Sequence, residues 1–583
     1  MHKIDISEVI LKKNPNFLGW MPRLFRKTAL YLIGKVLIID KINTFRRENS
    51  HKNGIDFIDE AFDYLDFSYT ISKRDRDRIK SEGRVVIVAN HPLGGLDGLA
   101  LVKLVSEIRP DVKVVVNDFL ANLSNLNSVF LPFDITFSRP QKSNFIRIKE
   151  TLLKESAVIF FPAGKVSRFR FSGIKDDVWH KGFLHFARQT NSPILPVHIT
   201  AKNSFFFYMI GAISDRLSML LLAREIYNKK GKTIEIKVGE IIPFKAVEDI
   251  KQEKVALKLL KKHVNLIGKG KRGIFRTERN IIHPVNRQLL KRELLSNEML
   301  GRTSDNKLML LLKADHNENV MNEIGRLREL TFRKVGEGTG RKSDTDLYDK
   351  TYKHLVLWDE EALEIVGSYR LGFCEEILGK SGPFGLYTAS LFNFSDVFLE
   401  TLPQSIELGR SFVQSRYWNT NALDYLWQGL GAILAKNPGI RYLFGPVSLS
   451  NSYSEYSKNL IIHFYKKWFS GTNNLVTAKN RFIPSPVYRQ EFSELFNNDD
   501  YKKELLILKK VLKNNGFAVP TLYKQYTEVT EAGGSAFLDF GIDPDFGDCI
   551  DGLIQVDITK IKPGKRDRYL GKKAVEEYTE VLV

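Results

Sequence analysis

The residues best suited to chemistry lie in one short turn near the start of the chain, where His91 is followed by Asp97. A β-branched run over residues 85–89 precedes the turn, and apolar residues at helical spacing follow it. This pattern predicts a turn at the end of a buried strand, where open α/β sheets bind ligands. A carboxylate that orients an imidazole makes a general base for a hydroxyl that attacks an acyl carbonyl. The alternative is a loop histidine beside an aspartate that only turns the chain.

The sequence of this turn, Asn90-His91 and then Asp97, resembles the first motif of the glycerolipid acyltransferase family. In the family four residues separate the histidine from the aspartate, whereas five separate them here. Gly94 and Gly95 are best able to absorb the extra residue, because glycine adopts positive φ without steric cost. The resemblance implies that His91 and Asp97 are catalytic and that Asn90 belongs to the substrate site.

Two later blocks are similar to the same family. Residues 162–168 stand where the family has Phe-Pro-Glu-Gly-Thr-Arg-Ser, and residues 193–197 match the apolar strand of its last motif. The resemblance implies four further substrate-binding residues: Gly164, Lys165, Ser167 and Arg168. Ala163 replaces the family's glutamate and Val166 its arginine, side chains that help to hold a polar acceptor, commonly a glycerol phosphate. We therefore expect a different acceptor.

The second half of the chain resembles the N-acetyltransferase-like (GNAT) superfamily, in its branch of acyl-homoserine-lactone synthases and lyso-ornithine-lipid synthases. Three segments carry the resemblance: Val366-Gly367-Ser368-Tyr369-Arg370, Glu407-Leu408-Gly409-Arg410 and Tyr442-Leu443-Phe444-Gly445. The expected elements are strands over 308–312, 354–359, 365–371, 405–411 and 441–446 and helices over 320–332 and 421–435. In the first half, strands near 84–89, 113–117, 156–161, 193–199 and 233–238 alternate with helices. Both domains are therefore expected to be α/β.

The acyl donor of the second domain is predicted from a loop that lacks glycine. Coenzyme-A-dependent members of the superfamily hold the pyrophosphate in a glycine-rich loop after the fourth strand. The matching segment, residues 411–420, contains no glycine. A thioester on acyl carrier protein fits better, so we expect no cofactor beyond acyl-carrier thioester substrates. Glu407 is the predicted catalytic residue, and Arg370, Arg410 and Arg416 are predicted to bind substrate. One alternative is that Glu407 and Arg410 form a strand pair that only bridges neighbouring elements. The other is that Arg410 and Arg416 are solvated surface arginines.

The two halves together resemble bifunctional ornithine-lipid or aminolipid synthases. On this hypothesis the C-terminal domain N-acylates a small amino acid, ornithine or glycine, with a 3-hydroxyacyl thioester. The N-terminal domain then O-acylates the new hydroxyl. The alternatives are an acylglycerol-phosphate acyltransferase with an ancillary domain, and a non-catalytic membrane-bound adaptor for acyl carrier protein.

Charge and cysteine content restrict the partners. The 583 residues carry a formal charge of +20, which favours an anionic partner. Acyl carrier protein and an anionic membrane surface are expected; nucleic acid is not, because no zinc-finger spacing appears and the resemblance points elsewhere. Two distant cysteines, Cys374 and Cys549, indicate a reduced cytoplasmic protein without a disulfide framework or metal site. The sequence leaves the oligomeric state open.

Membrane association is expected to be peripheral, on the inner face of the plasma membrane. Residues 18–39 have an interfacial amphipathic composition, with a solvated helix as the alternative. The apolar run 205–213 is too short to span a bilayer, so it is expected to lie in the interface, to line an acyl channel or to belong to the core.

The predicted organisation has four parts. They are a membrane-interface segment over 1–50, an O-acyltransferase domain over 51–267, a basic linker over 268–305 and an N-acyltransferase domain over 306–583. Helical spacing predicts a helix over 285–300. Residues 336–343 read as a flexible glycine-rich loop and residues 560–583 as a charged, peripheral end.

Overall fold

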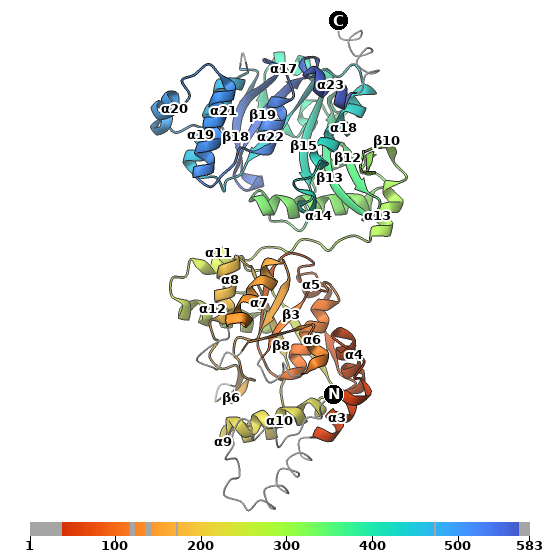
Figure 1. Ribbon diagram of the computed structural model, residues 1–583, viewed down its shortest axis with the longest axis vertical. Coiled ribbons are helices and arrows are strands. Elements are labelled where there is room, and N and C mark those ends of the chain that lie inside the picture. Colours follow the sequence, from red (N-terminus) through yellow and green to blue (C-terminus); the bar gives the residue numbers. More distant parts are fainter. Residues whose placement is uncertain (1–37, 117–122, 134–141, 171–172, 472–473, 571–583) are drawn as a thin grey trace, which may run out of the picture. The chain divides into compact units, whose positions relative to one another are not determined.

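The computed structural model describes residues 38–116, 123–133, 142–170, 173–471 and 474–570 (Figure 1). The chain divides into two compact units, Met1–His283 and Pro284–Val583. The division falls inside the segment predicted as a basic linker, residues 268–305. The amphipathic segment predicted over 18–39 lies outside the described residues except for its last two positions.

The first unit is built on a seven-stranded sheet in the order β1-β9-β8-β2-β5-β3-β4. All neighbouring strands are parallel except β8 and β9. The strands are β1 Ser68–Thr70, β2 Val85–Ala89, β3 Lys113–Val116, β4 Phe130–Pro132, β5 Ala157–Phe160, β8 Ile194–Thr200 and β9 Thr233–Val238. A separate hairpin pairs β6, Arg168–Arg170, with β7, Gly173–Lys175.

Helices cover both faces of this sheet. Alternate residues of β2 enter different cores: Val85 and Ile87 pack with α4 and α6, whereas Val86 and Val88 pack with α7, α8 and α12. A strand buried on both faces needs apolar residues at every position, which explains its unbroken aliphatic sequence. The helices are α3 Ile39–Glu48, α4 Ile55–Tyr64, α5 Lys73–Arg76, α6 Gly95–Ser106, α7 Lys142–Leu153, α8 Gly182–Thr190, α9 Phe205–Ile213, α10 Asp215–Tyr227, α11 Phe244–Glu248 and α12 Glu253–Gly268.

The second unit contains an eight-stranded sheet in the order β10-β11-β12-β13-β15-β16-β19-β18. Only β15 and β16 are parallel, and they pair over just three residues before they separate. The strands are β10 Glu298–Arg302, β11 Leu308–Lys313, β12 Lys353–Asp359, β13 Glu364–Phe373, β15 Ser405–Val413, β16 Tyr442–Leu449, β18 Ser535–Asp543 and β19 Cys549–Asp557, with β14 Phe392–Phe394 and β17 Val476–Ala478 forming a small second sheet.

Helices again cover both faces. Val356 and Trp358 of β12 pack with α14, whereas Leu355 and Leu357 pack with α18 on the opposite face. The helices are α13 Arg287–Leu294, α14 Glu318–Val335, α15 Cys374–Ser381, α16 Thr388–Leu391, α17 Asp396–Thr401, α18 Ala422–Ala435, α19 Glu455–Phe469, α20 Arg489–Leu495, α21 Tyr501–Asn514, α22 Thr521–Glu528 and α23 Pro563–Tyr569. Both units are thus α/β layered folds, as the sequence predicted.

The prediction of one helix over residues 285–300 is wrong. The helix α13 ends at Leu294, and β10 follows as an edge strand paired with β11. Leu290 and Leu294 are buried in the core of the second unit, so tertiary packing and strand pairing decide the structure there. The second unit therefore begins before its predicted first strand.

Two expectations about exposed segments also change. Glu329 of α14 holds the glycine-rich loop, because its carboxylate accepts hydrogen bonds from the Thr339 hydroxyl (2.7 Å) and the Gly340 N–H (2.9 Å). Near the end of the chain, Tyr569 of α23 is buried and its ring lies 5.7 Å from that of Trp427. This part of the predicted peripheral end therefore belongs to the core; residues 571–583 lie outside the described structure.

Candidate active sites

The first candidate site is the turn between β2 and α6. His91 Nδ1 lies 3.1 Å from Asp97 Oδ1, so the five intervening residues do not separate the pair. Gly94 has φ +98°, a conformation that side chains other than glycine's rarely adopt, and a Cβ there would lie 3.2 Å from Leu222. The extra residue is thus accommodated at a glycine, as expected.

Backbone N–H groups hold the Asp97 carboxylate. Oδ2 accepts hydrogen bonds from Leu93 N (2.8 Å) and Gly94 N (3.3 Å), and Oδ1 accepts one from Gly98 N (2.8 Å). The residue is fully buried in the first turn of α6, where the helix dipole favours a negative charge. Burial disfavours a charged His91, but the carboxylates of Asp97 and Asp176 together outweigh this effect and raise the pKa of the imidazole. Because Nδ1 faces Asp97, Nε2 is the nitrogen that can accept a substrate proton.

A second carboxylate, Asp176, organises the same loop and was missed by the sequence reasoning. It accepts hydrogen bonds from the His91 N–H (3.2 Å), the Ser167 hydroxyl (2.5 Å) and Trp179 Nε1 (3.1 Å). The ring of Phe161 lies 4.3 Å from the His91 imidazole, centre to centre. The histidine is therefore fixed by its backbone, its ring face and Nδ1 together.

The second candidate site is a buried cluster of arginines, aspartates and tyrosines in the second unit. Arg370 Nη1 donates to both oxygens of Asp346, at 2.6 and 2.7 Å. Arg410 Nε lies 3.3 Å from Asp344 Oδ2, and Arg328 Nη1 donates to Asp349 at 2.7 Å. Opposite charges packed closely in the interior satisfy much of each other's desolvation cost.

A β-bulge turns Arg410 into this cluster. Ser368 of β13 pairs with Phe412, but Arg370 pairs with Gly409, so β15 has one extra residue here. Arg410 lies in the bulge with φ +47°. A bulge reverses the usual alternation of side chains, which explains why Arg410 reaches the same cluster as Arg370.

Glu407 is buried beside the cluster and holds the start of α16. One oxygen accepts a hydrogen bond from the Thr388 N–H at 2.7 Å; the other accepts from the Tyr387 N–H at 3.2 Å and from the Tyr352 hydroxyl. Burial raises the pKa of this carboxyl, while these donors favour its charged form. The observed contacts are those of a residue that positions Tyr387.

Comparison with known proteins assigns a family to each half. Residues 9–270 match the family model described as an acyltransferase, and residues 327–428 match one described as an acetyltransferase (GNAT) domain. A glycine N(alpha)-acyltransferase of Bacteroides thetaiotaomicron is 36% identical over 315 residues, which are 52% of this chain and 92% of the relative. A lyso-glycine lipid O-acyltransferase of the same species is 30% identical over 256 residues, 42% of this chain and 91% of the relative. The chain belongs to both acyltransferase families.

Two solved structures each match one half of the chain. The 1-acyl-sn-glycerophosphate acyltransferase of Thermotoga maritima is 15% identical, with a TM-score of 0.25 over 43% of this chain and 86% of its own. A CoA-dependent acyl-homoserine lactone synthase is 14% identical, with a TM-score of 0.20 over 46% and 88% of the two chains.

In this acyltransferase, the side chains predicted to bind substrate in the first unit have different surroundings. The Asn90 amide joins β2 to β8 through two hydrogen bonds with the backbone of Ile199, at 2.9 and 2.7 Å. Ser167 bonds the His91 carbonyl through its N–H (2.8 Å). Gly164 has φ +62° in the same loop, and the side chain of Lys165 is exposed. Arg168 points away from this loop, because its Nη1 donates to the Ser218 hydroxyl of α10 at 2.6 Å.

Arg416 lies apart from the buried arginines. Its side chain is exposed and pairs with Glu364 at 2.6 Å, as Arg287 also does. The structure thus brings together Arg370, Arg410 and Glu407 but not Arg416.

Further acidic residues lie beside the arginine cluster, and sequence reasoning did not link them to it. Asp543 accepts a hydrogen bond from the Tyr387 hydroxyl at 3.0 Å, and Glu337 accepts one from the Ser448 hydroxyl at 2.9 Å. Asp551, on the neighbouring strand β19, is also buried. No signal in the sequence linked Asp543 or Asp551 to the arginines, which lie far from them along the chain.

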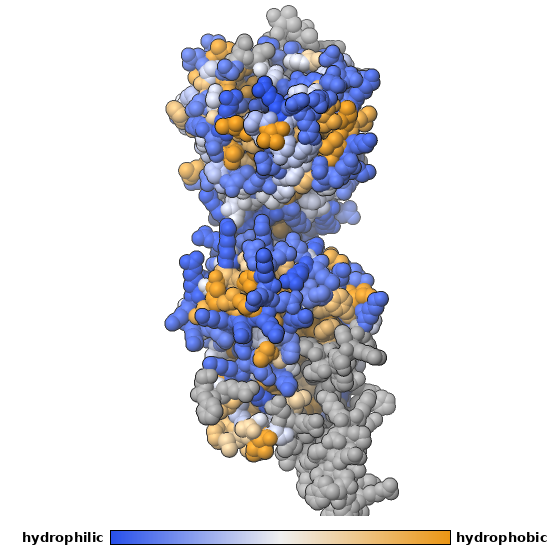
Figure 2. All heavy atoms as spheres, turned by 90° about the vertical axis from the view of Figure 1, so that its left-hand side faces the viewer, coloured by the Kyte–Doolittle hydropathy of each residue, from blue (hydrophilic) through white to orange (hydrophobic). Residues whose placement is uncertain are grey.

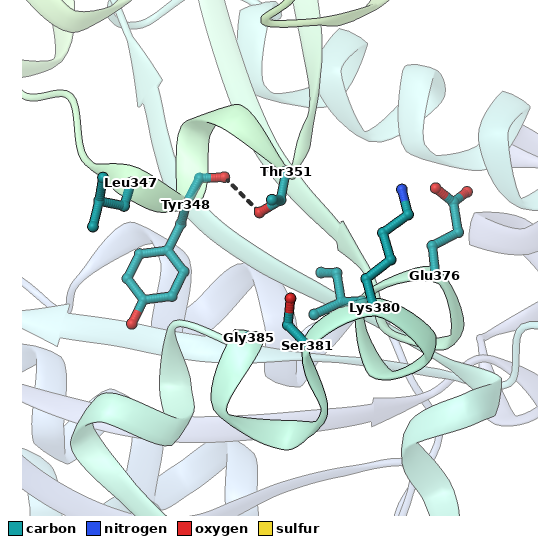
Figure 3. Close-up of a pocket in the computed structure, with 8 residues that line it drawn as sticks. Leu347, Tyr348, Thr351, Glu376, Lys380, Ser381 and Gly385 are labelled. Atoms are coloured by element: carbon teal, nitrogen blue, oxygen red, sulfur yellow. Dashed lines mark hydrogen bonds between the residues drawn. The ribbon is translucent and has the colours of Figure 1, made fainter.

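A small pocket of about 170 Å³ is lined in part by Tyr348 (Figure 3), and the Arg370 guanidinium carbon lies 5.7 Å from the centre of that ring. Lys380 and Glu376 extend side by side from α15 along one wall, opposite Leu347 and Tyr348. The Tyr348 ring also packs on that of Tyr387, with centres 5.5 Å apart. Among the described residues no group of three or more His, Cys, Asp or Glu side chains is arranged to bind a metal ion.

Proposed function

We propose that this acyltransferase makes a diacylated glycine lipid in two steps. The C-terminal unit N-acylates glycine with a 3-hydroxyacyl thioester, and the N-terminal unit O-acylates the hydroxyl of that product. The observation that carries the proposal is that one chain matches relatives named for N-acylation of glycine and for O-acylation of a lyso-glycine lipid. The sequence left ornithine and glycine open, and these relatives favour glycine.

The first unit has the groups that O-acylation needs. His91 Nε2 takes the proton of the 3-hydroxyl, whose oxygen attacks the carbonyl carbon of the thioester; the C–O bond forms and the C–S bond breaks. The imidazolium then returns its proton to the departing thiolate. Asp97 stabilises the imidazolium at 3.1 Å and fixes which nitrogen faces the substrate.

The backbone after β15 favours acyl carrier protein as the donor for N-acylation. A pyrophosphate loop needs free N–H groups, but those of Tyr417, Trp418 and Thr420 donate to carbonyl groups within the same turn. A phosphopantetheine arm has one phosphate and needs fewer such donors. We expect N-acylation to be more efficient with acyl carrier protein than with coenzyme A bearing the same chain, measured as kcat/KM. Equal efficiency for the two donors contradicts this assignment.

An exposed apolar surface on the first unit supports peripheral membrane binding. Phe205, Phe206, Met209 and Ile213 lie on one exposed side of α9, and Figure 2 shows a hydrophobic patch at the end of the first unit that carries α9. Phe169 and Ile174, which face each other across the β6–β7 hairpin, add to it. Exposed lysines flank the surface in sequence, at positions 165, 175 and 202. No helix in the described part of the chain is both long and apolar enough to cross a bilayer.

This surface adjoins the His91 turn. The side-chain amide of Asn203, two residues before α9, donates to the Pro92 carbonyl at 3.1 Å. The β6–β7 hairpin leads directly to Asp176, which bonds the His91 N–H. A membrane bound at α9 therefore presents a lipid acceptor near the predicted catalytic base.

Vesicle binding tests the membrane proposal. Replacing Phe205 and Ile213, which are 80% and 78% exposed, by serine is expected to weaken binding to phosphatidylglycerol vesicles about tenfold or more. Phe384 and Ile483 in the second unit are equally exposed, at 84% and 80%, and their replacement by serine is the control. Equal loss of binding in both double variants contradicts a specific surface on α9.

Lipid profiling tests the two-step function. The chain is expressed in a bacterial host without aminolipids, and the lipids are extracted and identified by mass spectrometry. A diacylated glycine lipid supports the proposal, whereas a diacylated ornithine lipid contradicts the choice of glycine. Extra phosphatidic acid supports the glycerophosphate alternative, and no lipid change contradicts the function.

A further inference from the structure

Polar side chains form a buried row across one face of the second sheet. Strand register places Arg370 of β13 opposite Gly409, Ser448 of β16 opposite Asp551 of β19, and Cys549 opposite Asp543 of β18. Arg370, Asp543 and Asp551 are each at most 5% exposed. The row has a positive end at β13 and β15 and an acidic end at β18 and β19.

At the positive end of the row, one edge of the Arg370 guanidinium lacks a hydrogen-bond partner among the described residues. Arg370 donates to Asp346 through Nη1, but Nε and Nη2 have no hydrogen-bond partner among the described residues. Buried polar groups rarely lack partners, and a guanidinium edge matches a carboxylate. In the same unit Arg326 fills this edge with Glu323, through Nε at 2.9 Å and Nη2 at 2.7 Å. The free edge of Arg370 is therefore suited to a carboxylate ligand.

Gly409 leaves room at that edge. A Cβ added to Gly409 would lie 3.8 Å from Arg370 Nε and 3.9 Å from Nη2, in ordinary contact with the two unpaired atoms. A side chain there would occupy space close to the free edge. Glycine keeps this space open at a position with no strained backbone.

The acidic end is only partly neutralised: Arg410 lowers the pKa of Asp551, but no salt bridge to Asp551 forms among the described residues. Asp551 receives one weak hydrogen bond, from Cys549 Sγ at 3.6 Å. Burial and the neighbouring charges of Asp543 and Glu337 raise the pKa of Asp551 to about 8. A ligand cation at this end would relieve the repulsion among the three carboxylates.

Tyr387 joins the two ends. Its ring centre lies 5.1 Å from the Arg370 guanidinium carbon, and its hydroxyl donates to Asp543 at 3.0 Å. The positive and acidic ends are thus one tyrosine side chain apart.

We propose that this row binds the amino-acid acceptor as a zwitterion, with its carboxylate on Nε and Nη2 of Arg370 and its ammonium at Asp551. The inference rests on the proposed N-acylation and adds the place and orientation of the acceptor. Asp551 takes a proton from the ammonium, and the resulting amine attacks the thioester carbonyl carbon. The C–N bond forms and the C–S bond breaks; the nitrogen loses its second proton to become the amide, and the departing thiolate takes up a proton in its place.

The experiment compares glycine with glycinamide, which lacks the carboxylate, as acceptors for the full chain with an acyl-carrier thioester. The native protein is expected to prefer glycine, and Arg370→Lys to reduce this preference about 10- to 100-fold, since lysine cannot offer the same paired edge. Arg326→Lys changes another buried arginine, 5% exposed, whose edge is already filled. It is expected to keep the preference.

Two more variants keep the test decisive if Arg370→Lys fails to fold. Gly409→Ala is expected to raise the KM for glycine about tenfold, with a smaller change in kcat, because the methyl group crowds the carboxylate. Asp551→Asn is expected to lower N-acylation at least 10²-fold, the scale of a lost general base, with O-acylation unchanged.

The outcomes separate this inference from the proposed function. If the native chain N-acylates no amino acid, the proposed function fails. If it N-acylates glycine but all three variants keep native KM, rate and preference for glycine, the function stands and the acceptor site is wrong.

Discussion

The two candidate sites are built in opposite ways. In the first unit a single turn just after β2 supplies both His91 and Asp97. The two residues lie within seven consecutive positions of the sequence. In the second unit the cluster gathers residues from α14, β13, β15, β18, β19 and the segment before β12, from Arg328 to Asp551. A local site depends on one turn, whereas a dispersed site depends on the register of a whole sheet. The first should be sensitive to single changes in chemistry and the second to changes in packing.

The largest expected effect is at His91. His91→Ala removes the predicted base and should lower O-acylation by about 10²–10⁴-fold. The measurement is the rate of O-acylation of a purified N-(3-hydroxyacyl)glycine. In cells the monoacylated lipid should accumulate.

N-acylation by the same variant is the internal control, because the second unit has its own cluster. Undiminished O-acylation by His91→Ala would make this histidine a loop residue and end the distinction between the two sites.

Asp97→Asn sharpens the account of the local site through pH. Burial lowers the pKa of His91, whereas the carboxylates of Asp97, the larger contributor, and Asp176 raise it. Removing the charge should therefore lower the pKa of the imidazole, which stays a neutral base at lower pH. The rising limb of the O-acylation pH profile should move to lower pH, and the maximal rate should fall by about 10². A reduced rate with an unmoved limb indicates that Asp97 only shapes the turn.

Patterns within short segments predicted much of the fold. The aliphatic run of β2 predicted a buried strand, and alternation and turns located β12 and β13 within about two residues. The segment after Leu294 was mispredicted because its apolar spacing suits a helix, while pairing with β11 makes it a strand. The outer face of α9 shows the same limit, because its exposure depends on which neighbours pack beside it.

The two candidate sites differ in the same way in how far the sequence could predict them. His91 and Asp97 were predictable because their motif is continuous in sequence. Arg410 was identified from its motif, but the bulge that turns it inward depends on how β15 pairs with β13. Nothing in the sequence joins Asp176 to His91 or Asp551 to Arg370, since only folding brings these residues together.

The smallest expected effect concerns Glu407, and it tests the dispersed site. Its carboxylate accepts hydrogen bonds from Tyr387 N, Thr388 N and the Tyr352 hydroxyl. Glu407→Gln replaces one accepting oxygen by an NH₂ group, which meets these donors with another donor. The free energy of unfolding should fall by about 1–3 kcal/mol, the usual cost of an unsatisfied buried polar group. Denaturant unfolding measures this change, and the pH profile of N-acylation shows whether Glu407 is also the base.

If Glu407 only positions Tyr387, the Glu407→Gln variant should lose a few-fold in the rate of N-acylation with an unmoved pH profile. A loss of 10²-fold or more together with a displaced profile would make Glu407 a catalytic base, and the second site would then depend on one residue as the first does.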